Sequence, residues 1–226
     1  MALLLATILP SILIILFFVY SDKFKEPRGE IIKVFFYGIL ITIPAYFLNT
    51  YIGDFFYANT RVSENLISSF LTAAPVEEGL KLSVLYYFVY KMKDFNEPMD
   101  GIVYGVTVSL GFATFENYDY VFRWAEEWGV DPYQMAIWRS YSAVPMHGLM
   151  GCIMGFYFGM YAFTANKKYL VLCLFVPFVI HGFYNFLSYP VHFMVLGVLV
   201  IYSVALHSHF KKLQFQKSRE SEIKKI

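Results

Sequence analysis

Seven stretches of about 20 predominantly apolar residues, separated by short polar breaks, set the strongest limit on what this chain can fold into. The core of a bilayer holds no water to pair with backbone N–H and C=O groups, so an apolar stretch of this length crosses it as a helix. The composition agrees, because 58 % of the residues are hydrophobic and only 15 % are charged, whereas soluble domains carry about 25 % charged residues. We therefore expect an all-α, polytopic transmembrane helix bundle that forms a single domain over residues 1–226. The expected spans cover residues 2–20, 31–52, 66–90, 100–120, 141–164, 169–188 and 190–208.

Two kinds of breaks separate these spans. The last two are divided at Tyr189-Pro190, because a proline cannot continue the hydrogen-bond ladder of the preceding helix. The segments 53–65 and 121–140 are longer and are expected to be loops on the outer side of the membrane.

The lysines and arginines predict the orientation, because cytoplasmic loops carry an excess of them. With the N-terminus outside, fourteen of the 18 fall in inner segments and three, Arg61, Arg123 and Arg139, in outer ones, while Lys81 lies within a span. We therefore expect the N-terminus outside and the C-terminus inside, with residues 209–226 as a basic cytoplasmic tail. The basic residues form no single patch, which argues against nucleic acid as a partner.

The third span contains an unusual group of charged residues. Glu77 and Glu78 are adjacent, and Lys81 lies three and four residues later, on the same helix face. Ionisable groups inside spans are costly to bury and mark functional sites. The pair and its lysine can partly neutralise one another.

Each of the next three spans adds polar residues at a similar depth. Glu116 and Asn117 lie near the outer end of the fourth span, His147 lies in the fifth, and His181 precedes Asn185 by one helical turn in the sixth. In the predicted orientation they all lie in the outer half of the bilayer or near its midplane. The sequence therefore predicts one polar site between the third and sixth spans.

Three functions are compatible with such a cluster. Peptide hydrolysis needs a base for water and donors for the developing oxyanion, and glutamate and histidine supply both. A proton-coupled transporter also uses carboxylates within the membrane, but transporters usually show repeated halves with broken helices, and this sequence shows none. A non-catalytic membrane protein that binds a partner is the third alternative. Simple cross-linking of helices is less favoured, because several ionised carboxylates at close range repel one another.

The sequence leaves the means of water activation open. It contains no signature of a serine or cysteine nucleophile, no pair of aspartates within spans and no His-Glu-x-x-His motif. Histidines with a carboxylate can hold a catalytic Zn²⁺ with one open position. Metal-free attack and attack assisted by Zn²⁺ or another divalent metal are both compatible with the residues, and the metal ligands would come from Glu77, Glu78, Glu116, His147 and His181.

Four motifs, in order along the chain, resemble the PrsW family of bacterial membrane proteases, which are distant relatives of the CAAX prenyl proteases and their bacterial immunity-type homologues. The resemblance covers the third to sixth spans, about residues 66–188. The motifs are Glu-Glu-x-x-Lys at 77–81, Phe-x-x-x-Glu-Asn at 112–117, His147, and His-x-x-x-Asn at 181–185.

The resemblance implies an intramembrane endopeptidase of the bacterial plasma membrane. Its expected substrate is a single-span anti-sigma factor, cut near the outer face in the first step of regulated intramembrane proteolysis. Glu77 and Glu78 would be base and proton shuttle, and His181 with Asn185 would stabilise the oxyanion. The CAAX-type relatives have Phe-x-x-x-His where this chain has Phe-x-x-x-Glu, so Glu116 replaces a histidine whose role His147 would take over. Lys81 and Asn117 would support the site.

Overall fold

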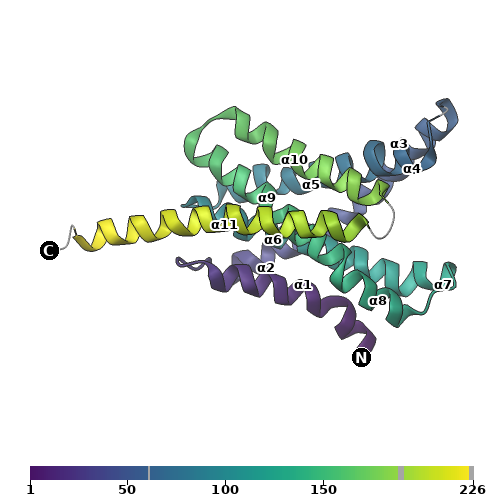
Figure 1. Ribbon diagram of the computed structural model, residues 1–226, viewed down its shortest axis with the longest axis horizontal. Coiled ribbons are helices and arrows are strands. Elements are labelled where there is room, and N and C mark those ends of the chain that lie inside the picture. Colours follow the sequence, from purple (N-terminus) through teal and green to yellow (C-terminus); the bar gives the residue numbers. More distant parts are fainter. Residues whose placement is uncertain (61, 188–190, 224–226) are drawn as a thin grey trace.

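The computed structural model describes residues 1–60, 62–187 and 191–223, and within them every regular element is a helix (Figure 1). This confirms the predicted all-α bundle. The predicted turn at Tyr189-Pro190, together with Arg61, Lys224 and Lys225, lies outside the described residues. The eleven α-helices are α1 (Ala2–Ser21), α2 (Arg28–Leu40), α3 (Thr42–Asn59), α4 (Glu64–Leu66), α5 (Ala74–Tyr87), α6 (Pro98–Asp119), α7 (Ala125–Glu127), α8 (Pro132–Tyr141), α9 (Ala143–Thr164), α10 (Lys167–Phe186) and α11 (Val191–Ile223).

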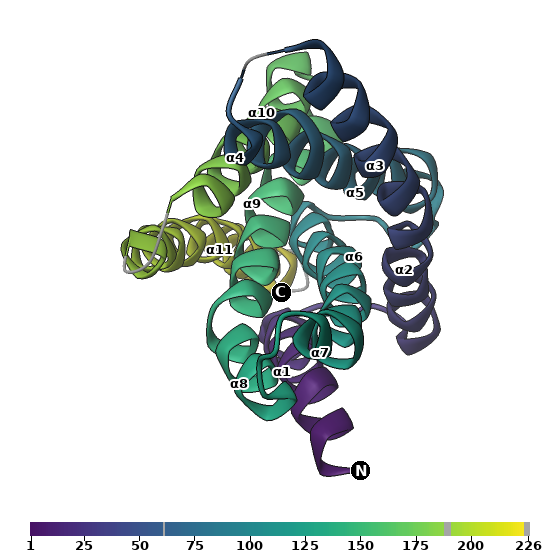
Figure 2. The ribbon, with the colours of Figure 1, turned by 90° about the vertical axis from the view of Figure 1, so that its right-hand side faces the viewer.

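Helices α6 and α9 form the centre of the bundle, with the other long helices around them (Figure 2). Glycines let the two backbones approach closely: Gly101 and Gly105 of α6 face Gly151, Gly155 and Gly159 of α9. A Cβ atom at Gly155 would collide with the backbone of Gly101. Small residues spaced four apart are the usual means of such packing in membranes.

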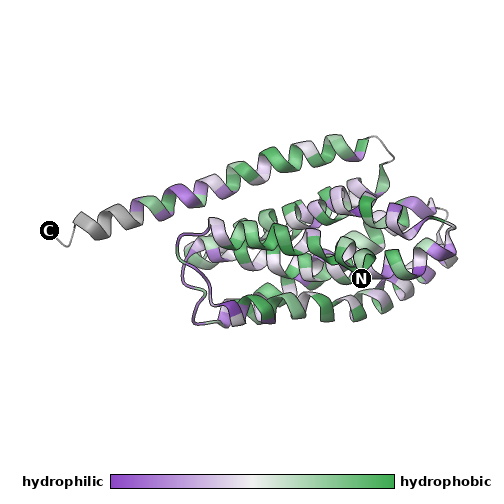
Figure 3. Ribbon diagram, turned by 90° about the horizontal axis from the view of Figure 1, so that it is seen from below, coloured by the Kyte–Doolittle hydropathy of each residue, from purple (hydrophilic) through white to green (hydrophobic). Residues whose placement is uncertain are grey.

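Five helical segments of the described chain are long and apolar enough to cross a membrane. The number of crossings and their direction stay predictions. Apolar residues run along the bundle, whereas polar residues gather at its ends and in α11 beyond its apolar first half, up to the residues drawn in grey (Figure 3). The N-terminus lies toward one end of the long axis, while α11 extends past the other helices at the opposite end (Figure 1). The five segments are Ala2–Ser21, Arg28–Tyr57, Pro132–Thr164, Lys167–Phe186 and Val191–Gln216.

The predicted spans 31–52 and 66–90 are both irregular. The first is divided into α2 and α3 at Ile41, three residues before Pro44, which has no N–H to continue the ladder. The second begins with α4 and continues as a π-helix, η1 (Ile67–Ala73), then α5, and ends in a 3₁₀ turn, η2 (Val89–Lys91). The wider π turns stand directly before Pro75, again a residue without a backbone donor, and irregular turns of this kind are frequent at functional sites.

The expected outer loop at 121–140 is largely helical, so the loop prediction was wrong there. Helix α6 runs on through a π-helix, η3 (Tyr120–Trp124), into α7, and α8 follows after a short turn. The turn uses Gly129 in the left-handed region and Asp131, whose side chain caps α8 by accepting from the N–H of Gln134. Helix α8 then packs against α1. The segment predicted as the basic tail continues α11 as helix through Ile223.

A network of buried acidic residues links three elements at the end of the bundle where α6 begins. Asp100 accepts the N–H groups of Asn96 and Glu97 at 2.7 and 2.8 Å, which caps α6. Gln214 of α11 donates to Asp22 at 2.7 Å and also to Glu97. These bonds tie the α1–α2 loop and α11 to the start of α6.

Glu26, in the same loop, accepts the hydroxyl proton of Tyr104. Burial raises the pKa of Glu26 to about 8, with the neighbouring Asp100 and Asp22 adding to the rise. Glu26 is therefore a carboxyl group that the fold favours in its protonated form.

Candidate active site

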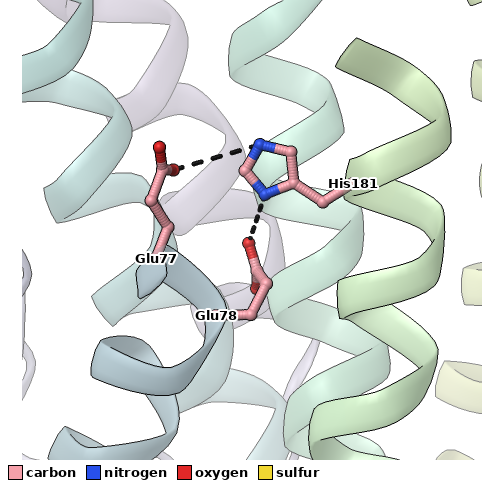
Figure 4. Close-up of side chains that lie close together, drawn as sticks. All are labelled: Glu77, Glu78 and His181. Carbon is pink, nitrogen blue, oxygen red and sulfur yellow. Dashed lines mark hydrogen bonds and ion pairs between the residues drawn. The ribbon is translucent and has the colours of Figure 1, made fainter. Parts of the chain in front are cut away.

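The double glutamate of α5 faces α10, and His181 points back between the two carboxylates (Figure 4). Glu78 is fully buried, and His181 and Glu77 are only 2 % and 5 % exposed. The Oε1 atom of Glu78 lies 2.8 Å from Nδ1 of His181 and 2.7 Å from Nζ of Lys81. Because an ionised carboxylate has no proton to donate, Nδ1 of His181 is the donor to Glu78.

This hydrogen bond fixes which nitrogen of His181 is free. With Nδ1 protonated, the neutral ring carries its lone pair on Nε2, and Nε2 lies 4.0 Å from Oε2 of Glu77. That Oε2 atom is buried and makes no hydrogen bond, and its distance to Nζ of Lys81 is 3.9 Å. A free carboxylate oxygen and a free imidazole nitrogen therefore face each other across a gap that can hold one small ligand or a water.

Glu116 and His147 form the second half of the cluster. Nε2 of His147 lies 3.1 Å from Oε2 of Glu116, and Nδ1 lies 3.1 Å from Nζ of Lys81. Lys81 has only donors, so Nδ1 accepts and Nε2 donates to Glu116. The rings of His147 and His181 are 5.5 Å apart and almost perpendicular. Lys81, fully buried and lying over the Phe112 ring, thus joins the two halves.

Arg139 of α8 completes the cluster, although sequence reasoning counted it only as a charge in an outer loop. Its Nη2 atom lies 2.7 Å from Oε2 of Glu116, and its Nε donates to Oδ1 of Asn117 at 2.9 Å. Asn117 in turn donates to the backbone oxygen of Thr7 in α1 at 2.7 Å. The guanidinium group also lies 3.8 Å from the centre of the Tyr120 ring. Nothing in its local sequence distinguishes Arg139 from the exposed Arg123, so only the fold reveals its role.

One polar cavity of about 330 Å³ connects most of the predicted residues. Glu77, Glu116, His147, His181 and Asn185 all line it. Asn185 is exposed, one turn beyond the buried His181. Glu78, Lys81 and Asn117 do not line the cavity but hold the residues that do. The structure thus brings every predicted site residue into one connected group.

The donor atoms of the cluster fit a divalent metal. One ligand atom from each of Glu77, Glu78 and His181 lies within 4.8 Å of the others, and the same is true of Glu77, Glu116 and His147. The Oε2 atoms of both Glu77 and Glu78 are buried without a hydrogen-bond partner. A metal-binding histidine typically donates its other ring N–H to a carboxylate, as His181 does to Glu78.

The charges of the cluster also favour a bound cation. Glu77, Glu78 and Glu116 are balanced by Lys81 and Arg139 alone while both histidines are neutral, which leaves one negative charge in a buried group. An uncompensated buried charge is strongly unfavourable. A divalent cation or an additional proton would compensate it.

Comparison with known proteins identifies the family. A family model described as PrsW family intramembrane metalloprotease matches residues 26–208. The chain is 36 % identical to Protease PrsW of Geobacillus kaustophilus over 185 residues, which is 80 % of this chain and 77 % of the relative. It is 36 % identical to Protease PrsW of Bacillus subtilis over 197 residues, 82 % of each chain. No solved structure matches the chain.

A third relative extends the match to almost the whole length. The chain is 30 % identical to Protease PrsW of Clostridioides difficile over 237 aligned positions, which cover 97 % of this chain and 98 % of the relative. The matched regions include all four motifs and the helices that carry them. The chain therefore belongs to the PrsW family of intramembrane metalloproteases and is a membrane peptidase.

Proposed function

We propose that this peptidase cleaves a single-span anti-sigma factor near the outer face of the bacterial plasma membrane, using the cavity between α5, α6, α9 and α10. The observation that carries the proposal is the free Oε2 of Glu77 facing the free Nε2 of His181 at 4.0 Å, at the wall of a polar cavity. This is a suitable place to hold and deprotonate a water. Burial increases the effect of each charge there.

Glu77 is the proposed general base. Its Oε2 takes a proton from the attacking water as the water oxygen bonds to the scissile carbonyl carbon and the carbonyl electron pair moves onto oxygen. When the C–N bond breaks, Glu77 returns the proton to the departing amine. The carboxylate is thus unchanged after one turnover, and one water has been added across the peptide bond.

Glu78 and Lys81 are positioning residues in this scheme. Glu78 accepts from His181 and Lys81 through the same oxygen, which fixes the ring of His181. The tautomer that follows directs the lone pair of Nε2 toward Glu77, where it can accept a hydrogen bond from the water or, in the metal-bound protein, would ligate the metal instead. The donor to the oxyanion is then the side-chain amide of Asn185, which lines the cavity one turn further along α10.

Glu116, His181 and one carboxylate oxygen of Glu77 are the proposed ligands of the family's metal. The other oxygen of Glu77 stays free as the base, and His147 positions Glu116 through its Nε2 proton. When bound, a divalent metal lowers the pKa of a coordinated water and polarises a carbonyl. Glu78 orients His181 in the same way whether or not the metal is bound.

The location of the cavity supports cleavage toward the outer face. Its remaining walls include Asn65, Tyr120 and Arg139. Asn65 and Arg139 lie in the segments that the charge asymmetry assigns to the outer side, and Tyr120 is the last residue of the fourth predicted span, at its outer end. A peptide bond of the substrate that lies close to the outer surface of the membrane would have to move least to reach such a site.

Co-expression tests the proposal. The chain is produced together with a single-span anti-sigma factor of the same organism that carries a tag on each side of the membrane, and the new end of any fragment is sequenced. We expect one cut near the outer end of the substrate's span with the wild type, and none with Glu77→Gln.

Glu127→Gln is the matched control, because Glu127 is an exposed glutamate of α7 in the segment assigned to the outer side. It should cleave like the wild type. Cleavage that Glu77→Gln leaves unchanged, or a cut on the cytoplasmic side of the span, would contradict the proposal.

A further inference from the structure

A second cavity reaches the two carboxylates from the side of the bundle. It has a volume of about 410 Å³ and lies between α3 and α6. Glu77 and Glu116 line both this cleft and the polar cavity described above. The two carboxylates therefore stand where an apolar cleft and a polar cavity meet.

The walls of the cleft face in the direction of the lipid. Tyr46 and Phe47 of α3 and Phe115 of α6 are exposed at its rim, while Ala45 and Phe112 are buried at its base. These three aromatic residues belong to helices that lie in or beside predicted spans. A molecule that enters the cleft would come from the bilayer.

Asn49 places an unsatisfied acceptor in this cleft. Its Oδ1 atom is buried and has no hydrogen-bond partner in the part of the chain that the structure describes. A buried polar atom without a partner is unfavourable, and more so in a membrane protein, where lipid offers no donor. A ligand of the cleft that carries an N–H group would satisfy it.

An unwound polypeptide segment has the matching chemistry. A peptide bond must leave its helix before water can attack it, and unwinding frees backbone N–H groups that need acceptors at membrane depth. A segment that remains helical offers no such N–H. At one end of the cleft the Asp119–Arg123 ion pair supplies polar groups where such a segment would emerge from the lipid.

We propose that the cleft between α3 and α6 admits an unwound segment of the membrane-spanning substrate from the lipid, and that Oδ1 of Asn49 accepts one of its backbone N–H groups. This inference rests on the proposed function. The substrate then enters from the α3–α6 side, and water enters through the polar cavity on the other side of Glu77 and Glu116.

The chain offers a matched control surface. A second apolar cleft, of about 480 Å³, lies between α5 and α10 and is lined by Pro75, Leu82, Phe175 and Phe178 among others. None of its lining residues is a residue of the polar cluster. Each cleft has an exposed phenylalanine, Phe115 at 41 % and Phe175 at 57 %.

Photo-crosslinking compares the two clefts. Phe115 or Phe175 is replaced by p-benzoylphenylalanine in the Glu77→Gln background, and the probe is the tagged anti-sigma factor that the wild type cleaves. We expect an adduct from position 115 at least about tenfold more abundant than that from position 175. Equal adducts, an excess from position 175, or none from position 115 would overturn the proposal. A probe that the wild type does not cleave would instead contradict the proposed function.

Asn49→Leu separates substrate binding from folding. Because Oδ1 has no partner among the described residues, the thermal midpoint should not fall, whereas cleavage should slow about five- to tenfold, as for the loss of one hydrogen bond. An unchanged cleavage rate, or a rate loss matched by a lower midpoint, would exclude Asn49 as a substrate ligand.

Discussion

Replacing Arg139 by methionine tests whether a residue of α8 holds the catalytic cluster in place. The change keeps most of the side-chain volume but removes the bonds of 2.7 Å to Glu116 and 2.9 Å to Asn117. Asn117 Oδ1 is left buried without that donor, and among the described residues the Oε2 atom of Glu116 keeps only His147 as a partner.

The expected loss of stability follows from how deeply the Arg139–Glu116 ion pair is buried. Breaking a buried ion pair costs about 3–5 kcal/mol. The Glu116 side chain is 23 % exposed, so solvation recovers part of that loss. We therefore expect the free energy of unfolding to fall by roughly 2–4 kcal/mol. For a chain of this length this corresponds to a fall in Tm of roughly 5–15 °C. Cleavage should fall as well, because Glu116 loses its orientation.

Thermal unfolding of the purified protein in detergent measures the change, with Arg123→Met as control. Arg123 also pairs with a carboxylate at 2.7 Å, that of Asp119, but its side chain is 61 % exposed. Exposed pairs contribute about 0–1 kcal/mol, so this variant should lose less than about 4 °C. Equal shifts for the two variants would refute the reasoning, as would an Arg139→Met effect that is as large in a Glu116→Gln background as in the wild type.

Three further predictions concern packing, protonation and metal. Gly155→Leu should lower Tm strongly, because the leucine side chain would meet the backbone of Gly101. Gly197→Leu is the control and should not lower Tm, because no atom lies within 4 Å of a Cβ at that position. Similar midpoints for the two variants would contradict the close α6–α9 contact. Since the pKa of Glu26 is about 8 in the folded chain and 4.5 in the reference state, the folded state binds more protons between these values, so Tm should fall as pH rises from 6 to 8.5. Glu26→Gln should flatten that slope, and an unchanged slope would refute the assignment. Purified wild type should retain a divalent metal whose removal by a chelator slows cleavage, and His181→Leu should retain less of it; full activity of metal-depleted protein would contradict this.

The helical bundle and the convergence of the candidate residues on one place could be predicted from the sequence because both depend on residue type and spacing. Apolar stretches long enough to cross a bilayer have few alternatives to helix. Glutamates and histidines within such stretches have few polar partners available other than one another.

What the sequence could not predict depends on three-dimensional proximity. Arg139 lies in a segment that reads as a loop, and only the fold of α8 against α1 brings it to Glu116. The role of Lys81 was predicted only in part: its contact with Glu78 follows from helical spacing, but its bond to His147 joins residues 66 positions apart. The direction of the His181 ring, and hence the free Nε2, also required the observed contact with Glu78.

The central claim is that Glu77 is the base of a single hydrolytic site, and the rate constant of peptide-bond cleavage in proteoliposomes tests it most directly. Purified wild type, Glu77→Gln and Glu127→Gln are compared on the same tagged anti-sigma factor under single-turnover conditions, after their thermal midpoints have been matched. We predict that Glu77→Gln loses about 10²- to 10⁴-fold, the usual contribution of a general base, and that Glu127→Gln stays within twofold of the wild type. A folded Glu77→Gln variant that cleaves within twofold of the wild type would contradict the account.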